Sequence, residues 1–262
     1  MASDKILCER DGAVGRLVFN NPARHNAVSL EMWEAAERVV RDLVDDDDIR
    51  VIVVTGAGDK AFVSGADISR FEEERGTAEA VARYNAVVSS SLDALHGAAK
   101  PTIAMIRGHC VGGGVGLAIC CDLRFCSETS RFGVPAARLG LGYGLTGVRR
   151  LMDVVGPAFA KEIFFTGRRF DAREAAAMGL VNRVVADAEL ESFVDDTART
   201  IAANAPLTVR SIKRIVGEVL KDPGERDPEA CDRLVQACFD SQDYVEGRRA
   251  FLEKRKPVFA GR

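Results

Sequence analysis

The sequence predicts an α/β fold followed by a helical C-terminal region. Two continuous apolar segments, residues 50–55 (RVIVVT) and 102–106 (TIAMI), are typical of strands that are buried on both faces of a sheet. Both alternate along the chain with stretches of helical periodicity, and this repeated order is characteristic of α/β proteins. From Gly144 onward the pattern is almost wholly helical.

The N-terminal elements follow from turn residues and periodicity. Residues 5–20 alternate around Asp11-Gly12, which indicates a β-hairpin. Ser29 is a suitable N-cap for an amphipathic helix over residues 30–44. A glycine-containing loop follows the strand at 50–55 and leads to a second amphipathic helix around residues 77–95.

The remaining elements complete the α/β core and the helical region. After the strand at 102–106 the sequence has a glycine turn at 112–114, an apolar helix and a strand at 122–127. Further predicted helices are 145–155, 157–166, 171–178, 188–204, 206–221, 228–240 and 242–255, with one short strand at 180–185. Proline suits the first turn of a helix, so Pro206 marks a boundary between a core (1–204) and a C-terminal helical region (205–262).

The composition and charge of the chain argue against several classes of partner. The 262 residues carry a net charge of −3, which argues against nucleic acid. The polar N-terminus does not resemble a signal peptide, and no apolar run approaches the ~18 residues of a membrane span, so a cytoplasmic protein without a membrane partner is expected. Seven cysteines without CxxC spacing predict buried, reduced thiols and no metal site.

The glycine turn is the strongest candidate for chemistry. A glycine run before a helix exposes backbone N–H groups that can hold a phosphate or an oxyanion. The GxGxxG at residues 142–147 has no clear strand before it and is a weak nucleotide motif. We expect residues 64–67 and 112–114 to follow the strands at 50–55 and 102–106, so that one N–H from each loop meets at an oxyanion hole. Donors of this type contribute about 3 to 4 kcal/mol each.

Two segments carry a family resemblance. GDKAFVSGADI (58–68) and IRGHCVGGGVGLAICCDLRF (106–125) resemble the signature segments of the crotonase family, the enoyl-CoA hydratase/isomerase superfamily. The agreement extends to residues 20–29, 132–142, 166–185 and 246–259. The resemblance implies a crotonase-like spiral of ββα repeats whose C-terminal helices build a homotrimer or a dimer of trimers. It also implies an acyl-CoA thioester substrate, in which CoA is part of the substrate and no separate cofactor is needed.

The resemblance assigns roles to individual residues. The N–H groups of Ala66 and Gly113 would hold the thioester oxygen and stabilise an enolate. The residues implied in CoA binding are Asp67 and Ile68 beside the adenine, Arg24 near the phosphates, and Lys254, Lys256 and Phe259 near the nucleotide of the same or a neighbouring subunit.

The chain departs from the family where hydratases carry two catalytic glutamates. Gly116 and Ala136 occupy those positions, so efficient two-glutamate hydration is not expected. Three readings stay open: a hydratase or isomerase with substitute residues, a malonyl-type decarboxylase or other lyase that uses Tyr143, and a non-catalytic acyl-CoA binder. Arg138 is either a ligand for a substrate carboxylate or a surface residue, and Glu72 to Glu74 are expected to be solvated charges.

Overall fold

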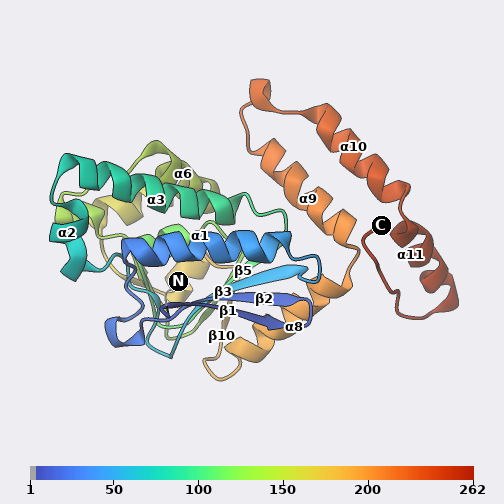
Figure 1. Ribbon diagram of the computed structural model, residues 1–262, viewed down its shortest axis with the longest axis horizontal. Coiled ribbons are helices and arrows are strands. Elements are labelled where there is room, and N and C mark those ends of the chain that lie inside the picture. Colours follow the sequence, from blue (N-terminus) through green and yellow to red (C-terminus); the bar gives the residue numbers. More distant parts are fainter. Residues whose placement is uncertain (1–3) are drawn as a thin grey trace.

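The computed structural model describes residues 4–262, except for the side chains of Ile68, Phe71 and Glu72, and it shows two sheets and a set of covering helices (Figure 1). The larger sheet has six strands in the order β1-β2-β3-β5-β7-β10, and the smaller has four in the order β4-β6-β8-β9. The strands of the larger sheet are β1 (Ile6–Asp11), β2 (Val14–Phe19), β3 (Val51–Gly56), β5 (Thr102–Ile106), β7 (Leu123–Ser127) and β10 (Arg183–Val185). Those of the smaller sheet are β4 (Ala61–Val63), β6 (His109–Val111), β8 (Arg131–Gly133) and β9 (Phe170–Asp171).

Strand pairing shows how the two sheets arise from one repeated unit. The hairpin β1-β2 is antiparallel with Ile6 opposite Phe19, and the other strands of the larger sheet pair in parallel. In each of the pairs β3/β4, β5/β6 and β7/β8, the first strand joins the larger sheet and the second joins the smaller one. This division produces the predicted spiral of ββα units.

The helices cover both faces of the larger sheet. They are α1 (Leu30–Asp45), α2 (Phe71–Arg75), α3 (Ala78–His96), α4 (Gly113–Ala118), α5 (Ala136–Leu139), α6 (Leu145–Thr166), α7 (Ala172–Ala177) and α8 (Leu190–Ala203). The main core packs α1 and α4 between the sheets and the outer helix α3, and it includes Phe19, Trp33 and Phe132. A second apolar cluster, which includes Val53 and Val194, joins the opposite face of the larger sheet to α8.

Three further helices form the C-terminal region and extend away from the core (Figure 1). They are α9 (Pro206–Val219), α10 (Pro228–Phe239) and α11 (Gln242–Glu253). The ammonium group of Lys213 on α9 donates to the Asp122 carboxylate at 2.7 Å, and the same carboxylate oxygen accepts the backbone N–H of Thr102 at 2.7 Å. One carboxylate therefore attaches α9 to the central strand β5.

The long elements agree with the sequence prediction. Ser29 caps α1 by accepting the N–H of Met32 at 3.4 Å. The helix break expected between residues 155 and 157 is a kink at Gly156, whose φ is 76°, followed by Pro157. The short strands of the smaller sheet were not predicted. No helix in the part of the chain that the structure describes is long and apolar enough to cross a membrane.

Candidate functional site

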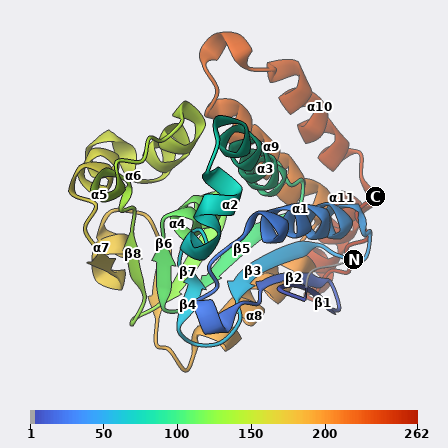
Figure 2. The same ribbon diagram turned by 60° about the vertical axis from the view of Figure 1, so that its left-hand side comes forward.

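The two glycine-containing loops lie against each other. Strands β4 and β6 are parallel, so the loops that follow them begin at the same edge of the smaller sheet. A Cβ built on Gly113 would lie 3.9 Å from the Cα of Gly65. The meeting of the two loops was predicted. The strands that directly precede the loops, however, are β4 and β6, whereas β3 and β5 lie one strand earlier in the chain (Figure 2).

Close backbone approach explains the glycines at this edge. A Cβ on Gly114 would lie 2.1 Å from the carbonyl oxygen of Val63, a distance that a methyl group cannot occupy. Gly65 and Gly112 have φ values of 112° and 55°, which favour glycine for conformational reasons. The sequence GGG therefore allows α4 to begin directly on top of β4.

Among the atoms that the structure describes, two backbone N–H groups at this contact have no protein acceptor. The backbone on either side of Ala66 is held by Val28, which donates to Gly65 O at 2.9 Å and accepts from the Asp67 N–H at 3.0 Å. Within residues 4–262, the N–H groups of Ala66 and Gly113 donate to no protein atom. Unpaired donors from two adjacent loops are suited to bind one oxygen atom that carries negative charge.

Arg24 and Asp67 also meet beside the first loop. The Asp67 carboxylate is 7% exposed and accepts hydrogen bonds from Arg24 Nη1 at 3.1 Å and from the Ser69 hydroxyl at 2.7 Å. Burial acts to raise the pKa of Asp67, but the hydrogen bonds from Ser69 and the charge of Arg24 outweigh it and lower the pKa. The pair is thus ionised, and it holds the 3-10 turn Pro22–Arg24 against the loop. The predicted contact of the Ile68 side chain lies outside the described residues.

Trp33 packs directly behind the glycine turn. It is the single tryptophan of the chain, it is 1% exposed, and its Cζ2 atom would lie 3.6 Å from a Cβ on Gly113. Its ring meets Phe19 edge to face at 6.0 Å. The fluorescence of the indole should therefore respond to changes at the glycine turn.

The comparisons with known proteins cover nearly the whole chain. A family model described as "Enoyl-CoA hydratase/isomerase" matches residues 9–262. The chain belongs to this family. It is 35% identical to the crotonyl-CoA hydratase of Syntrophomonas wolfei over 99% of both chains, and 32% identical to the short-chain-enoyl-CoA hydratase of Clostridium acetobutylicum over 98% of this chain and 97% of the relative. It superimposes with a TM-score of 0.95 on an enoyl-CoA hydratase/carnithine racemase from Magnetospirillum magneticum, at 40% identity over 99% of this chain and 97% of that one.

Gly116 and Ala136, the positions at which the family resemblance led us to expect glutamates, are apolar. Gly116 lies on α4, and a Cβ built on it would lie 4.0 Å from Leu92 Cδ1 of α3. Ala136 is the first residue of α5 and is 6% exposed. Neither residue can accept or donate a proton.

The side chains of Glu73 and Glu74 are engaged in other contacts, and the side chain of Glu72 lies outside the described residues. Glu74 was expected to be solvated, but its side chain is 6% exposed and accepts the backbone N–H of Leu30 at 3.1 Å. This contact satisfies one of the free N–H groups in the first turn of α1. Glu73 is exposed and pairs with Arg70 at 3.0 Å, as expected for a solvated charge.

Tyr143 lies between α5 and α6, with its ring edge to face against Phe164 at 4.8 Å. Tyr143 is 38% exposed as a whole residue, but the protein atoms around its phenol partly desolvate it and raise its pKa, and the positive charge of Arg75 partly opposes this rise. The Arg75 guanidinium carbon lies 3.9 Å from the ring centroid of Tyr84. Sequence reasoning missed Arg75 and Tyr84, because they stand on two separate helices and match no motif.

The other predicted site residues have contacts in other parts of the fold. Arg138 is exposed on α5, and its side chain packs against the turn at Gly167. Lys254, Lys256 and Phe259 belong to the segment that follows α11, and Figure 1 shows α11 on the opposite side of the molecule from α2. The ring of Phe259 packs on Gly247, and its carbonyl oxygen accepts from Arg50 at 2.8 Å. One chain therefore does not bring these three residues to the loops.

The remaining sequence motifs have structural explanations. Cys110 is fully buried, and burial raises the pKa of its thiol well above the usual range. The GxGxxG at 142–147 follows the helix α5 rather than a strand. In the described part of the chain, no three His, Cys, Asp or Glu side chains are grouped to hold a metal ion.

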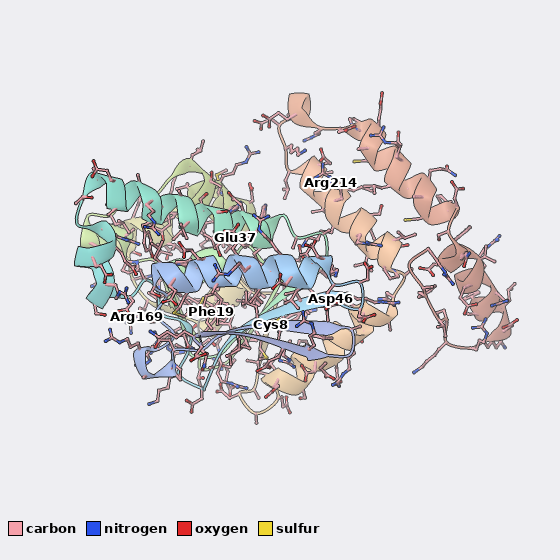
Figure 3. All side chains as sticks on the ribbon, viewed as in Figure 1. Cys8, Phe19, Glu37, Asp46, Arg169 and Arg214 are labelled. Carbon is pink, nitrogen blue, oxygen red and sulfur yellow. The ribbon has the colours of Figure 1, made fainter. Side chains whose placement is uncertain are left out.

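One groove on the described surface lies apart from the two loops. A groove of about 440 Å³ lies between α1 and α3 and is lined by residues that include Glu37 and Arg41. Figure 3 labels Glu37 on the side of α1 that faces α3. Charged side chains that line this groove pair with one another, as Arg41 does with Glu37 at 2.6 Å. The groove is therefore unlike an acyl-CoA site, which is mostly apolar.

Proposed function

We propose that this chain is an acyl-CoA thioester enzyme that stabilises an enolate in a backbone oxyanion hole. The unpaired N–H groups of Ala66 and Gly113 in touching loops carry the proposal, because they can donate to one thioester oxygen. As negative charge develops on that oxygen, preorganised donors strengthen their hydrogen bonds, and each contributes about 3 to 4 kcal/mol at the transition state. CoA enters as part of the substrate, so the reaction needs no separate cofactor.

The proposed CoA contacts come from two places. Arg24, Asp67 and Ile68 would hold the phosphates and the adenine beside the first loop. Lys254, Lys256 and Phe259 would contact the nucleotide of a neighbouring subunit, since they lie too far from the loops of their own chain. A homotrimer, alone or paired into a dimer of trimers, would bring them there. Exposed apolar side chains on α9 to α11 support this assembly: Ile212, Val216, Val219, Val235, Phe239, Val245, Phe251 and Leu252.

The acid/base chemistry distinguishes this chain from a two-glutamate hydratase. Each missing general acid or base typically reduces the rate by about 10² to 10⁴-fold, and both are missing here. We infer a hydratase- or isomerase-like enzyme of the enolate type whose rate of crotonyl-CoA hydration is low. If no other group delivers the proton, the chain is a non-catalytic acyl-CoA binder.

A second candidate is decarboxylation of a malonyl-type acyl-CoA, with Tyr143 as the proton donor. Loss of carbon dioxide breaks the bond between Cα and the carboxyl carbon and leaves its electron pair on the enolate, so no base is required. The Tyr143 phenol would then give its proton to Cα, and water would reprotonate the phenolate. The raised pKa keeps Tyr143 protonated at neutral pH, as a proton donor must be.

An assay with four CoA esters tests these alternatives. Crotonyl-CoA, a 3-enoyl-CoA, methylmalonyl-CoA and saturated butyryl-CoA are incubated with the protein, and products are followed by mass, while binding is followed by the fluorescence of Trp33. Hydration of crotonyl-CoA at an ordinary hydratase rate would refute the proposed roles of Gly116 and Ala136. Binding without any turnover identifies a binder, and absence of binding refutes the proposal.

Restoring the two glutamates provides a positive test. A Cβ at Gly116 would make only an ordinary contact with Leu92, whereas Ala136 is buried, so urea unfolding of the double variant Gly116→Glu/Ala136→Glu first checks that it folds. We expect it to hydrate crotonyl-CoA at least ~10²-fold faster than the parent, since each acid or base contributes about 10² to 10⁴-fold. Tyr143→Phe tests the second candidate: loss of methylmalonyl-CoA turnover with unchanged binding supports it, and unchanged turnover refutes it.

We further propose that the protein works in the cytoplasm. All seven cysteines are free thiols, and four of them are buried in the core. Free thiols are maintained in a reducing compartment. Expression as a fusion with a fluorescent protein would show a diffuse cytoplasmic signal, whereas an extracellular or membrane-associated signal would contradict this location.

A further inference from the structure

The carboxylate of Glu74 is fixed at the start of α1 and has one unused oxygen. Its side chain is 6% exposed, and Oε1 accepts the backbone N–H of Leu30 at 3.1 Å and lies 3.7 Å from Arg70 Nε. Among the residues that the structure describes, no group donates a hydrogen bond to the second oxygen, Oε2. One half of this buried carboxylate is therefore held in place, and the other half is available to accept a proton.

The segment before α1 links this carboxylate to the first loop. Val28 forms a parallel β-bridge with Ala66 and binds the backbone on both sides of it, at 2.9 and 3.0 Å. Neighbouring strands lie ~4.8 Å apart, and the extended Ser29 carries the chain ~6.6 Å further to Leu30. These two steps run at right angles and combine to ~8 Å. With the 3.1 Å bond to Leu30, the carboxylate lies no more than roughly 11 Å from Ala66.

Trp33 links the same helix end to the second loop. It stands three residues after Leu30, and helical side chains lean toward the N-terminus, so its indole covers the first turn of α1. Its Cζ2 atom would lie 3.6 Å from a Cβ on Gly113. Figure 2 shows α2, which carries Glu74, at this end of α1. Both loops of the proposed oxyanion hole are therefore next to the helix end that binds Glu74.

The separation from Ala66 selects one carbon of the acyl chain. An oxygen bound in the hole lies ~3 Å from the Ala66 nitrogen. In a 2-enoyl-CoA, Cα lies ~2.4 Å from that oxygen and Cγ up to ~5 Å from it, because each bond is about 1.2 to 1.5 Å long. Measured from Ala66, Cγ therefore reaches ~8 Å and Cα only ~5.5 Å. Cγ is the carbon that comes within about 3 Å of the Glu74 carboxylate, which is the distance for proton transfer.

We propose that Glu74 is the catalytic base of this chain and removes a proton from Cγ of a 2-enoyl-CoA. Glu74 supplies the proton acceptor that Gly116 and Ala136 do not. The Cγ–H bond breaks, and its electron pair forms a Cβ=Cγ double bond. The Cα=Cβ pair moves to the bond between Cα and the thioester carbon, and the thioester oxygen takes the negative charge, which the N–H groups of Ala66 and Gly113 hold. Glu74 gives the proton back to Cγ, or to Cα to form a 3-enoyl-CoA. This inference rests on the proposed acyl-CoA function and names its base.

Exchange with heavy water tests the inference. Crotonyl-CoA is incubated with the protein in D2O, and deuterium in the γ-methyl group is followed by proton NMR and by mass. The parent should exchange these protons, and Glu74→Gln should exchange them about 10²- to 10⁴-fold more slowly. The glutamine oxygen can still accept the Leu30 N–H, so the variant should unfold at the parental urea concentration. It should also bind butyryl-CoA within about twofold of the parental affinity, because the N–H groups of the hole are unchanged.

Glu73→Gln is the matched control. Glu73 is the adjacent glutamate of α2, but it is exposed and pairs with Arg70 at 3.0 Å, so its loss should leave the exchange rate within about twofold of the parental rate. If Glu74→Gln does not fold, Glu74→Asp decides the question. Aspartate keeps the charge but retracts the carboxylate by more than ~1 Å, which should slow the exchange by about 10²-fold.

The binding of butyryl-CoA separates failure of the inference from failure of the proposed function. Exchange at the parental rate in the folded Glu74 variant overturns the inference, and so does the absence of γ-exchange from the parent. In both cases binding of butyryl-CoA shows that the acyl-CoA function itself stands. If no ester binds, the proposed function is refuted, and the inference with it.

Discussion

Replacing Gly114 with alanine should separate the two loops of the proposed oxyanion hole. The added methyl group would lie 2.1 Å from the backbone oxygen of Val63. Because close-packed interiors do not allow such a contact, α4 and β4 must move apart by roughly 1 Å. Overpacking of this kind typically costs about 1 to 3 kcal/mol of unfolding free energy. A displacement of ~1 Å at the Gly113 N–H should also lower turnover by about 10²-fold.

Gly116→Ala is a matched control in the same helix. Its methyl group would meet Leu92 at 4.0 Å, an ordinary contact, so the substitution should stabilise the helix by about 0.5 to 1 kcal/mol. Both variants gain the same intrinsic helix propensity, so the difference between them isolates the contact with Val63. Urea unfolding followed by the fluorescence of Trp33 measures both free energies, because this residue is the single tryptophan and is fully buried.

The two variants should differ in the urea concentration at which they unfold. Gly114→Ala should unfold at lower urea concentration than the parent, and Gly116→Ala at the same or higher concentration. If Gly114→Ala is as stable as Gly116→Ala, the backbone approach of α4 to β4 does not explain the glycine. If it is destabilised but turns over acyl-CoA at the parental rate, the position of the Gly113 N–H does not limit the reaction.

Three further predictions concern other parts of the fold. Glu74→Ala should cost about 1 to 2 kcal/mol of unfolding free energy, because it frees a buried N–H, whereas Glu73→Ala should cost little; urea unfolding measures both. Burial lowers the pKa of His109 below its usual 6.5, so the unfolded chain binds more protons and thermal stability falls as pH drops below ~6.5. His109→Gln should reduce this loss of thermal stability at low pH. An unchanged pH profile of the melting temperature would contradict the role given to His109. Asp243→Ala frees two N–H groups of the tail at 254–262, so carboxypeptidase should remove the tail faster than from the parent.

Sequence reasoning found the elements whose patterns are long enough to be distinctive. The buried strands at 51–56 and 102–106 and the amphipathic helices α1 and α3 were all predicted close to their observed bounds. The three-residue strands β4, β6 and β8 were not, because three residues show no periodicity and their partners are more than 20 residues away in the chain. These strands set the position of both loops.

Part of the candidate site could be named from the sequence, and the roles of its residues stay predictions. Ala66 and Gly113 could be named because a glycine run and a family signature are local features of the sequence. Glu74 was misread as a solvated charge, since its acceptor role depends on the first turn of α1, 44 residues earlier in the chain. Arg75 could not be selected at all from a run of charged residues, because only the folded chain stacks it on Tyr84.

The carboxylate of Asp122 has a consequence for regulation. It holds Lys213 of the protruding helix and the first residue of the strand β5, which leads through β6 into the glycine turn. A change in the orientation of α9 must strain or break these charge-assisted bonds. Any association that selects one orientation of α9 would therefore bias the loops, and by thermodynamic reciprocity a ligand in the loops would bias association to the same degree. In the proposed oligomer, Asp122 would thus be the side chain that links α9 to the proposed oxyanion hole.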